Sequence, residues 1–210
     1  MKIELLHTVG SNCAQRVLWA LQYKKIPHTR IDFDHLSEAE ILRVSPFGKV
    51  PAISVDGRGL AESMAIVEFL DEAFPEKPLL PKDMFQRGKV REVALLVDGT
   101  IHAVQNSKVS KFFHPEATKD EVFSYRAKWI TRWLPKLEPL LFHNSEWAIG
   151  SSFSMADIFI VPLFVKGLFV GVELAQFPRF KRYLAHCASN ADAWSCAPTE
   201  LRISVAKTLS

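Results

Sequence analysis

The sequence predicts a chain of two unlike halves, in which a mixed α/β half precedes an all-helical half. Up to about residue 76 the apolar residues alternate between strand and helix periods, whereas the rest of the chain shows helical periods alone. The segment PEKPLLPKD at 75–83 carries three prolines and several charges, which is typical of a linker between packed units. We therefore expect an α/β domain at 1–76, a linker at 77–84 and a helical bundle at 85–210.

The elements of the first half are predicted in the order strand, helix, strand, helix, strand, strand, helix. They are expected at residues 2–8, 13–24, 28–34, 36–45, 51–57, 59–62 and 63–74. A helix joins the first two strands, so these are expected to be parallel. A tight turn at Asp56-Gly57-Arg58-Gly59 joins the last two, which indicates an antiparallel hairpin. The result is a mixed four-stranded sheet with the thioredoxin-like order of elements.

The second half is predicted to contain only helices, at about 83–112, 119–142, 154–170, 177–189 and 199–207. The helix from residue 154 has a well-formed start. Ser154 and Asp157 have the spacing of a capping box, and Phe153 and Ile158 that of a hydrophobic staple. These features are a folding device and carry no information on chemistry.

Composition excludes several function classes. The net charge is +3, and the 26 Lys and Arg residues are scattered along the chain, so nucleic acid is not an expected partner. The apolar stretch at 158–165 is too short to cross a bilayer and contains a proline, so no membrane association is expected either. Cys13, Cys187 and Cys196 are odd in number and lack metal-ligand spacing. This predicts reduced thiols in the cytoplasm, and no metal site.

Several local motifs in this architecture resemble those of the glutathione transferases. The segment SPFGKVPAISVDG is similar to the part of that family that binds the cysteinyl backbone of glutathione, here through Lys49, Val50 and Pro51. The resemblance implies a cis peptide bond before Pro51. Glu62 and Ser63 match the family's pair at a helix start. There the serine hydroxyl and the helix amides hold the γ-glutamyl carboxylate.

The stretch SNCAQRVLWAL resembles the zeta class of this family, which includes maleylacetoacetate isomerase. Ser11, Cys13, Arg16 and Val17 match the class signature, and Asn12 stands where the class has a second serine. The zeta pattern also shares IHAVQN, which ends in Gln105 and Asn106, and PTELR near the end of the chain; it covers nearly all of the sequence. The resemblance implies glutathione as cosubstrate, glutathione contacts by Gln105 and Asn106, and a homodimer.

The chemical need at residues 11–13 is to ionise the thiol of glutathione. A free thiol has a pKa of about 8.5, and lowering it by two units requires about 2.7 kcal/mol of preference for the thiolate. A hydrogen bond from the Ser11 hydroxyl and the positive end of the following helix can supply this. The Asn12 amide can also donate. Cys13 allows a rival mechanism through a mixed disulfide, or is a buried packing residue. We expect Ser11 to be the activating residue.

The second substrate is predicted to be a small, partly hydrophobic electrophile. Gly10 and Phe169 stand where the isomerases have arginines, whereas Phe112, Phe113, Phe164, Leu168 and Phe169 offer an apolar surface. Lys108, Lys111, His102 and His114 are further candidate cations. The predicted activity is glutathione transfer. The alternatives are a glutathione-dependent cis-trans isomerase of maleylacetoacetate or maleylpyruvate, and a transferase-shaped interaction protein without catalysis.

Overall fold

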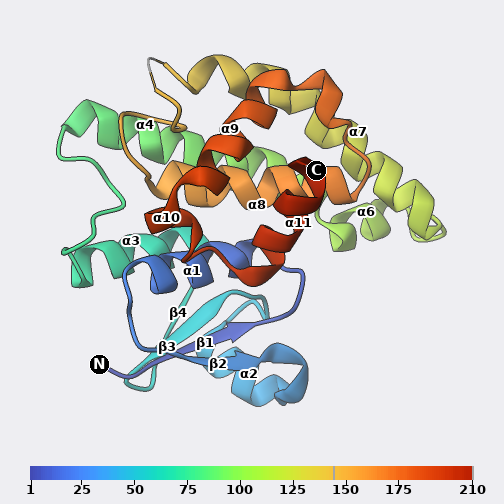
Figure 1. Cartoon of the computed structure of the whole chain (residues 1–210). Coiled ribbons are helices and arrows are strands. Elements are labelled where there is room, and N and C mark those ends of the chain that lie inside the picture. Colours follow the sequence, from blue (N-terminus) through green and yellow to red (C-terminus); the bar gives the residue numbers. More distant parts are fainter. Residues whose placement is uncertain (144, 210) are drawn as a thin grey trace.

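A four-stranded mixed sheet forms the base of the first half (Figure 1). The computed structural model describes residues 1–143 and 145–209. The first-half elements are β1 (Ile3–His7), α1 (Asn12–Tyr23), β2 (Thr29–Asp32), the short 3-10 helix η1 (Phe33–His35), α2 (Glu38–Val44), β3 (Ala52–Val55), β4 (Arg58–Ala61) and α3 (Ser63–Ala73). The strand order is β2-β1-β3-β4, with β1 parallel to β2 and antiparallel to β3. The predicted thioredoxin-like order is confirmed.

The hairpin between β3 and β4 is tighter than predicted. Only Asp56 and Gly57 form the turn, with φ of 48° and 85°, while Arg58 and Gly59 belong to β4. Two successive positive φ values define a type I′ turn, whose twist matches that of the paired strands. Gly59 is required for a different reason, because a Cβ there would lie 2.8 Å from the Val44 backbone in α2.

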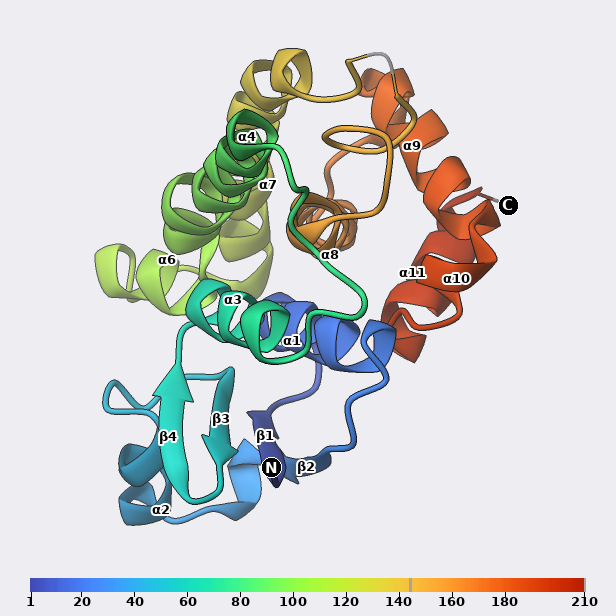
Figure 2. The ribbon, with the colours of Figure 1, turned by 90° about the vertical axis from the view of Figure 1, so that its left-hand side faces the viewer.

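The two faces of the sheet are covered by different helices. Leu5 and Ile53 belong to the main hydrophobic core, which includes α1 and α3, whereas Leu6 and Ala52 pack with Val44 of α2. This is the alternation of side chains expected along a strand. Consequently α1 and α3 lie between the sheet and the helical half (Figures 1 and 2).

The helical half is built around α8 (Met155–Phe169), which is seen end-on in Figure 2. Around it lie α4 (Met84–Leu95), the π-helical segment η2 (Leu96–His102), α5 (Ala103–Gln105), α6 (Ser107–Phe113), α7 (Lys119–Leu137) and η3 (Glu138–Leu140), and then η4 (Leu174–Gln176), α9 (Pro178–Ser189), α10 (Ala191–Trp194) and α11 (Thr199–Leu209). Ser154 and Asp157 form the predicted capping box. In the described part of the chain, no helix is long and apolar enough to cross a membrane.

The predicted helix at 83–112 is interrupted. Asn106 has an extended ψ of 132°, and its side chain accepts a hydrogen bond from the Lys108 amide, so it ends α5 and caps α6. Asparagine favours such caps because its side chain competes for backbone hydrogen bonds. Apolar periodicity does not reveal this break, since the pattern continues across it.

The segment between the two halves is fastened by Lys24 at the end of α1. Its buried ammonium donates to the carbonyls of Phe74 and Lys77 at 2.8 and 2.7 Å and pairs with Asp71 at 2.7 Å. Asp71 also accepts a hydrogen bond from the Leu79 amide at 2.7 Å. The linker therefore packs against α1 and α3. The predicted domain boundaries at 76 and 84 stay predictions.

Candidate active site

The strand register brings three candidate segments to one end of the sheet. Leu6 of β1 pairs with Ala52 of β3, and Ala52 pairs with Ala61 of β4. The loop that follows β1, the residues that precede β3 and the residues that follow β4 therefore lie side by side. These are the segments that carry the predicted residues at 11–13, 49–51 and 62–63.

Ser11 is the N-cap of α1. Its Oγ accepts a hydrogen bond from the Ala14 amide at 3.2 Å. Because this contact uses a lone pair of the oxygen, the hydroxyl hydrogen is free to be donated to another group. The positive end of α1 lies beside it, which favours a negative charge at this position.

Ser63, at the first turn of α3, is arranged in the same way. Its buried Oγ accepts a hydrogen bond at 3.1 Å from Nη1 of Arg16, which lies in α1. The guanidinium can only donate, so the Ser63 oxygen is the acceptor in this contact, and the Ser63 hydroxyl also donates toward the Cys13 thiol, which acts to lower the pKa of that thiol. Glu62 precedes it as N-cap with a φ of 72°, a conformation that is costly for a residue with a side chain and is typical of functional sites.

Arg16 is a fully buried cation, with an exposed fraction of 0%. Its Nη1 also pairs with the carboxylate of Asp98 in η2, and its guanidinium lies over the ring of Phe159 in α8, 4.4 Å from the centroid. Its Nε and Nη2 are buried with no hydrogen-bond partner among the described residues. Arg16 thus connects the start of α3 with both η2 and α8. A charged residue on the apolar face of the predicted helix at 13–24 is the signal by which the sequence could have revealed it.

The Val50–Pro51 peptide bond is cis, as predicted. The ladder between β3 and β4 begins at Ala52, so Val50 precedes the paired part of the strand. Lys49 is held through its backbone, because Ser45 Oγ donates to its carbonyl at 2.7 Å and accepts from its amide at 3.0 Å. Its side chain is exposed.

His102, the last residue of η2, contacts the first turn of α1. Its Nε2 lies 3.1 Å from Cys13 Sγ, and its Nδ1 lies 3.3 Å from Asn12 Nδ2 and 2.8 Å from Gln105 Nε2. Burial, followed by repulsion from Arg16, lowers the pKa of the imidazole from 6.5 to about 3. His102 is therefore neutral near pH 7, and the expectation that it supplies positive charge is wrong.

Cys13 is buried beside this imidazole. Burial raises the pKa of its thiol, an effect only partly offset by the nearby charge of Arg16. A reactive cysteine needs a low pKa and access to solvent, and Cys13 has neither. These observations favour a packing role over the rival nucleophile.

Gln105 and Asn106 end the short helix α5. The side chain of Gln105 is buried, and its Oε1 accepts from Arg126 Nη2 at 3.1 Å and from Nε at 3.3 Å. Arg126, in α7, also donates to the Gln105 carbonyl at 2.7 Å. The predicted contacts of Gln105 and Asn106 with glutathione stay predictions, since the structure shows their protein contacts only.

Lys166 in α8 brings a cation to the loop before α1. Its Nζ donates to the Gly10 carbonyl at 2.9 Å and lies 5.1 Å from the ring centroid of Phe169. Burial and the charge of Arg126 lower its pKa, and it forms no ion pair with any described residue. Gly10 has a φ of 77°, where an arginine side chain would be strained.

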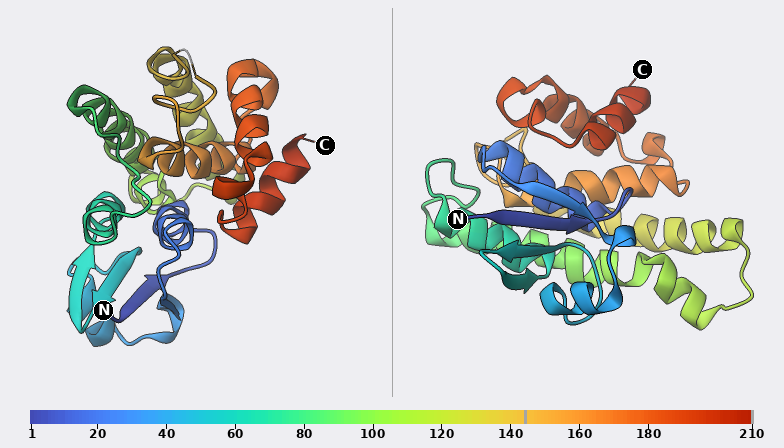
Figure 3. Two further views of the ribbon diagram at one scale, coloured as in Figure 1. Left: turned by 60° about the vertical axis from the view of Figure 1, so that its left-hand side comes forward. Right: turned by 90° about the horizontal axis from the view of Figure 1, so that it is seen from below.

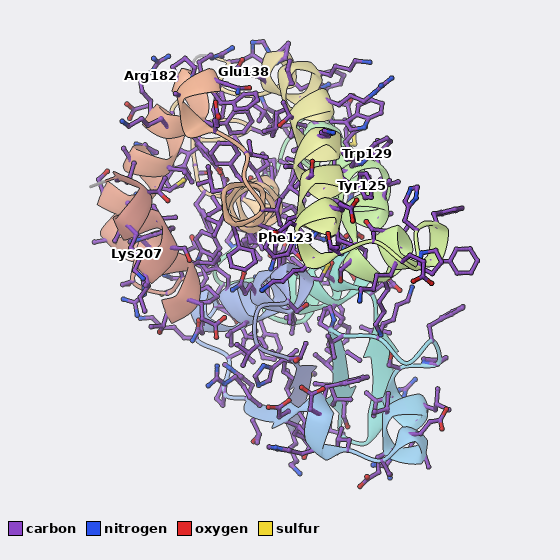
Figure 4. All side chains as sticks on the ribbon, turned by 90° about the vertical axis from the view of Figure 1, so that its right-hand side faces the viewer. Phe123, Tyr125, Trp129, Glu138, Arg182 and Lys207 are labelled. Atoms are coloured by element: carbon purple, nitrogen blue, oxygen red, sulfur yellow. The ribbon has the colours of Figure 1, made fainter. Side chains whose placement is uncertain are left out.

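The predicted apolar surface is divided. Phe164 is a core residue that stacks on Phe180 at 4.8 Å, whereas Phe112 and Phe113 in α6 are 80% and 70% exposed. The ring of Phe169 lies 5.5 Å from that of Phe123, which Figure 4 labels on α7. Phe123 and Phe169 together with Lys166 therefore form an aromatic surface with a cation, near Ser11.

The sheet end of the thioredoxin-like half carries a cis-proline, two serine hydroxyls and two helix N-termini, and a helical half completes the molecule. This is the general form of a glutathione-binding enzyme. The sequence profile of the glutathione S-transferase N-terminal domain matches residues 10–73, and that of the C-terminal domain matches residues 96–191. The chain belongs to the glutathione S-transferase family.

Named relatives point to one branch of this family. The chain is 33% identical over 178 residues to a probable maleylacetoacetate isomerase of Caenorhabditis elegans, covering 82% of each chain. It is 31% identical to maleylacetoacetate isomerase of Pseudomonas aeruginosa, covering 87% of this chain and 88% of the relative. A solved structure of a zeta-class maleyl pyruvate isomerase is similar over 94% of this chain and 97% of its own, with a TM-score of 0.83 and 25% identity. The resemblance to the zeta class is confirmed.

Proposed function

We propose that this protein binds glutathione at the sheet end and that Ser11 activates its thiolate for attack on a small, partly hydrophobic electrophile. The observation that carries this proposal is the Ser11 hydroxyl, whose oxygen accepts a hydrogen bond from the Ala14 amide at 3.2 Å. Its hydrogen is left for a thiolate sulfur at the positive end of α1. The buried thiol of Cys13 supports Ser11 over the rival mechanism.

The remaining contacts follow from the same geometry. Val50 and Pro51 are proposed to hold the cysteinyl backbone, with Lys49 beside them. Glu62 and Ser63 are proposed to hold the γ-glutamyl end, where the α3 amides and the Ser63 hydroxyl meet a carboxylate. A solved maleylacetoacetate isomerase of Anaeromyxobacter dehalogenans with bound GSH is similar over 94% of this chain, with a TM-score of 0.79 and 26% identity, which supports this placement.

Calorimetric titration of glutathione into the protein, with the Ser11→Ala and Ser63→Ala variants alongside, tests the proposal. Ultraviolet absorbance then measures the bound thiolate near neutral pH. Ser11→Ala is expected to retain binding but to lose the thiolate signal, and Ser63→Ala is expected to weaken binding by about tenfold. Wild-type protein that binds no glutathione would refute the proposal and leave the interaction-protein reading.

Isomerisation of a maleyl keto acid is the second candidate. Lys166 favours it, because its Nζ at the Gly10 carbonyl places a cation without a described counterion beside Ser11. A substrate carboxylate would supply that counterion. The relatives named as isomerases support the same reading. Comparing maleylacetoacetate with chlorodinitrobenzene as second substrates decides between the two activities.

We also propose that the protein is a homodimer. Phe47, in the loop before β3, is 83% exposed, and Met84, Phe85 and Leu95 are exposed along α4. Exposed apolar side chains of this size typically mark interaction sites. A second copy of the chain is the partner expected for this family.

A further inference from the structure

We propose that His102 is a positioning residue that fixes the thiolate-binding turn of α1, and that Arg126 sets the direction of its hydrogen bonds through Gln105. The inference rests on the proposed function, because it concerns how that turn is held. Its elements come from both halves of the molecule. Figure 3 shows α1 lying against the helical half, and the contacts of His102 with Asn12 and Cys13 join it to η2.

The first step is the orientation of the Gln105 amide. A guanidinium can only donate hydrogen bonds, so the Gln105 atom that faces Arg126 must be the carbonyl Oε1. Two contacts of 3.1 and 3.3 Å fix it there. The amide nitrogen then faces His102, at 2.8 Å from Nδ1. Gln105 is therefore the donor in that contact.

The second step is the tautomer of His102. Its Nδ1 accepts from Gln105 at 2.8 Å and faces the Asn12 amide nitrogen at 3.3 Å, so it carries no hydrogen. The buried imidazole is neutral, because burial holds its pKa at about 3. A neutral imidazole carries one hydrogen, which must then be on Nε2. Nε2 donates it to Cys13 Sγ, 3.1 Å away.

These hydrogen bonds hold the first turn of α1. Asn12 and Cys13 directly follow Ser11 as the first residues of α1. His102 donates to Cys13 Sγ and accepts from Asn12, and these two contacts hold both side chains on the His102 side. The amides of this turn therefore keep one orientation. This series of hydrogen bonds starts at the Arg126 guanidinium and ends at the N-terminus of α1, so it also adds to the positive electrostatic potential at that end of the helix. Both effects favour a thiolate bound at Ser11.

The experiment uses three variants that change these hydrogen bonds, of which Gln105→Glu keeps the size of the side chain. Gln105→Glu replaces a donor by a carboxylate, which pairs with Arg126 and accepts from Nδ1 of His102, so the hydrogen moves from Nε2 to Nδ1. His102→Gln keeps one donor and one acceptor, whereas His102→Leu removes both. Nitrogen-15 NMR of the imidazole reports the tautomer, and ultraviolet titration of bound glutathione reports the pKa of its thiolate.

We expect the Nε2–H tautomer in the wild type and the Nδ1–H tautomer in Gln105→Glu. The pKa of the bound thiol should rise by about one unit in Gln105→Glu and in His102→Leu and stay near the wild-type value in His102→Gln. Because Gln105→Glu also adds a charge, it is repeated in the His102→Leu background. An equal rise there would show a charge effect alone and overturn the inference.

Two further outcomes would also overturn it. One is an Nδ1–H tautomer in the wild type. The other is a tautomer that switches in Gln105→Glu while the thiol pKa does not change. Failure of the proposed function is recognised separately, because the wild type would then show no bound thiolate and no heat of glutathione binding.

Discussion

Asp98→Ala is expected to destabilise the protein strongly, because it removes the carboxylate that neutralises the buried guanidinium of Arg16. The Arg16 side chain has an exposed fraction of 0% and that of Asp98 one of 23%. Removing one partner of a buried ion pair costs about 3 to 5 kcal/mol, and the partial exposure of Asp98 places the loss at about 3 kcal/mol. For a chain of this length that corresponds to a fall in Tm of about 6 to 12 °C.

Urea unfolding measures the free energy of unfolding, and calorimetry measures glutathione affinity in the same samples. The double variant Arg16→Met/Asp98→Leu is the control. It leaves no buried charge, so its stability should return to near the wild-type value. Its glutathione affinity should be lower than that of the wild type, because Ser63 has lost the Arg16 donor that directs its hydroxyl. If Asp98→Ala unfolds within about 0.5 kcal/mol of the wild type, the buried pair does not have the role argued from its geometry.

Four further predictions follow from other contacts. Lys24→Met should lower the free energy of unfolding by about 3 kcal/mol in urea unfolding, because it leaves the largely buried Asp71 without its cation. As the pH falls from 6.5 to 5, the unfolded chain takes up a proton that folded His102 does not bind, so the wild type should lose about 1.6 kcal/mol more stability than His102→Gln. Lys166→Met should lower kcat/KM about tenfold for chloroacetate but not for chlorodinitrobenzene; equal losses would argue against a carboxylate contact. Phe47→Ser should shift the protein from dimer to monomer in light scattering, and an unchanged mass would place the interface elsewhere.

Local patterns predicted much of the fold. The alternation of periods located each strand of the sheet, and the Ser154–Asp157 spacing located the start of α8. The break at Asn106 and the π-helical winding of η2 were not predictable in this way, because both preserve the apolar pattern of an ordinary helix. The contacts that decide such details are made between distant parts of the chain.

The same distinction applies to the site. Residues that act through the backbone or a helix start, such as Pro51 and Ser63, lie in short motifs. Asp98 and Lys166 do not, because each is defined by a contact with an element far along the chain, and Arg16 lies in the signature at residues 11–21 but its role depends on such contacts. A charge on an apolar helix face identifies Arg16 as unusual, but the sequence does not show that its partners are Ser63 and Asp98.

The polar groups of the site share one arrangement, which bears on how it binds an anion. Ser11 Oγ accepts from the Ala14 amide, Ser63 Oγ accepts from Arg16, and Cys13 Sγ faces the Nε2 of His102. In both serines the oxygen accepts a hydrogen bond from a protein donor, and at Ser11 the hydroxyl hydrogen remains for the ligand. Donors that already have this orientation need no reorganisation when a thiolate or carboxylate arrives, and this is the condition under which hydrogen bonds stabilise charge best. On the proposal made above, the buried Arg16 and His102 act before glutathione binds, Arg16 through its contact with Ser63 and His102 through its contacts with Asn12 and Cys13.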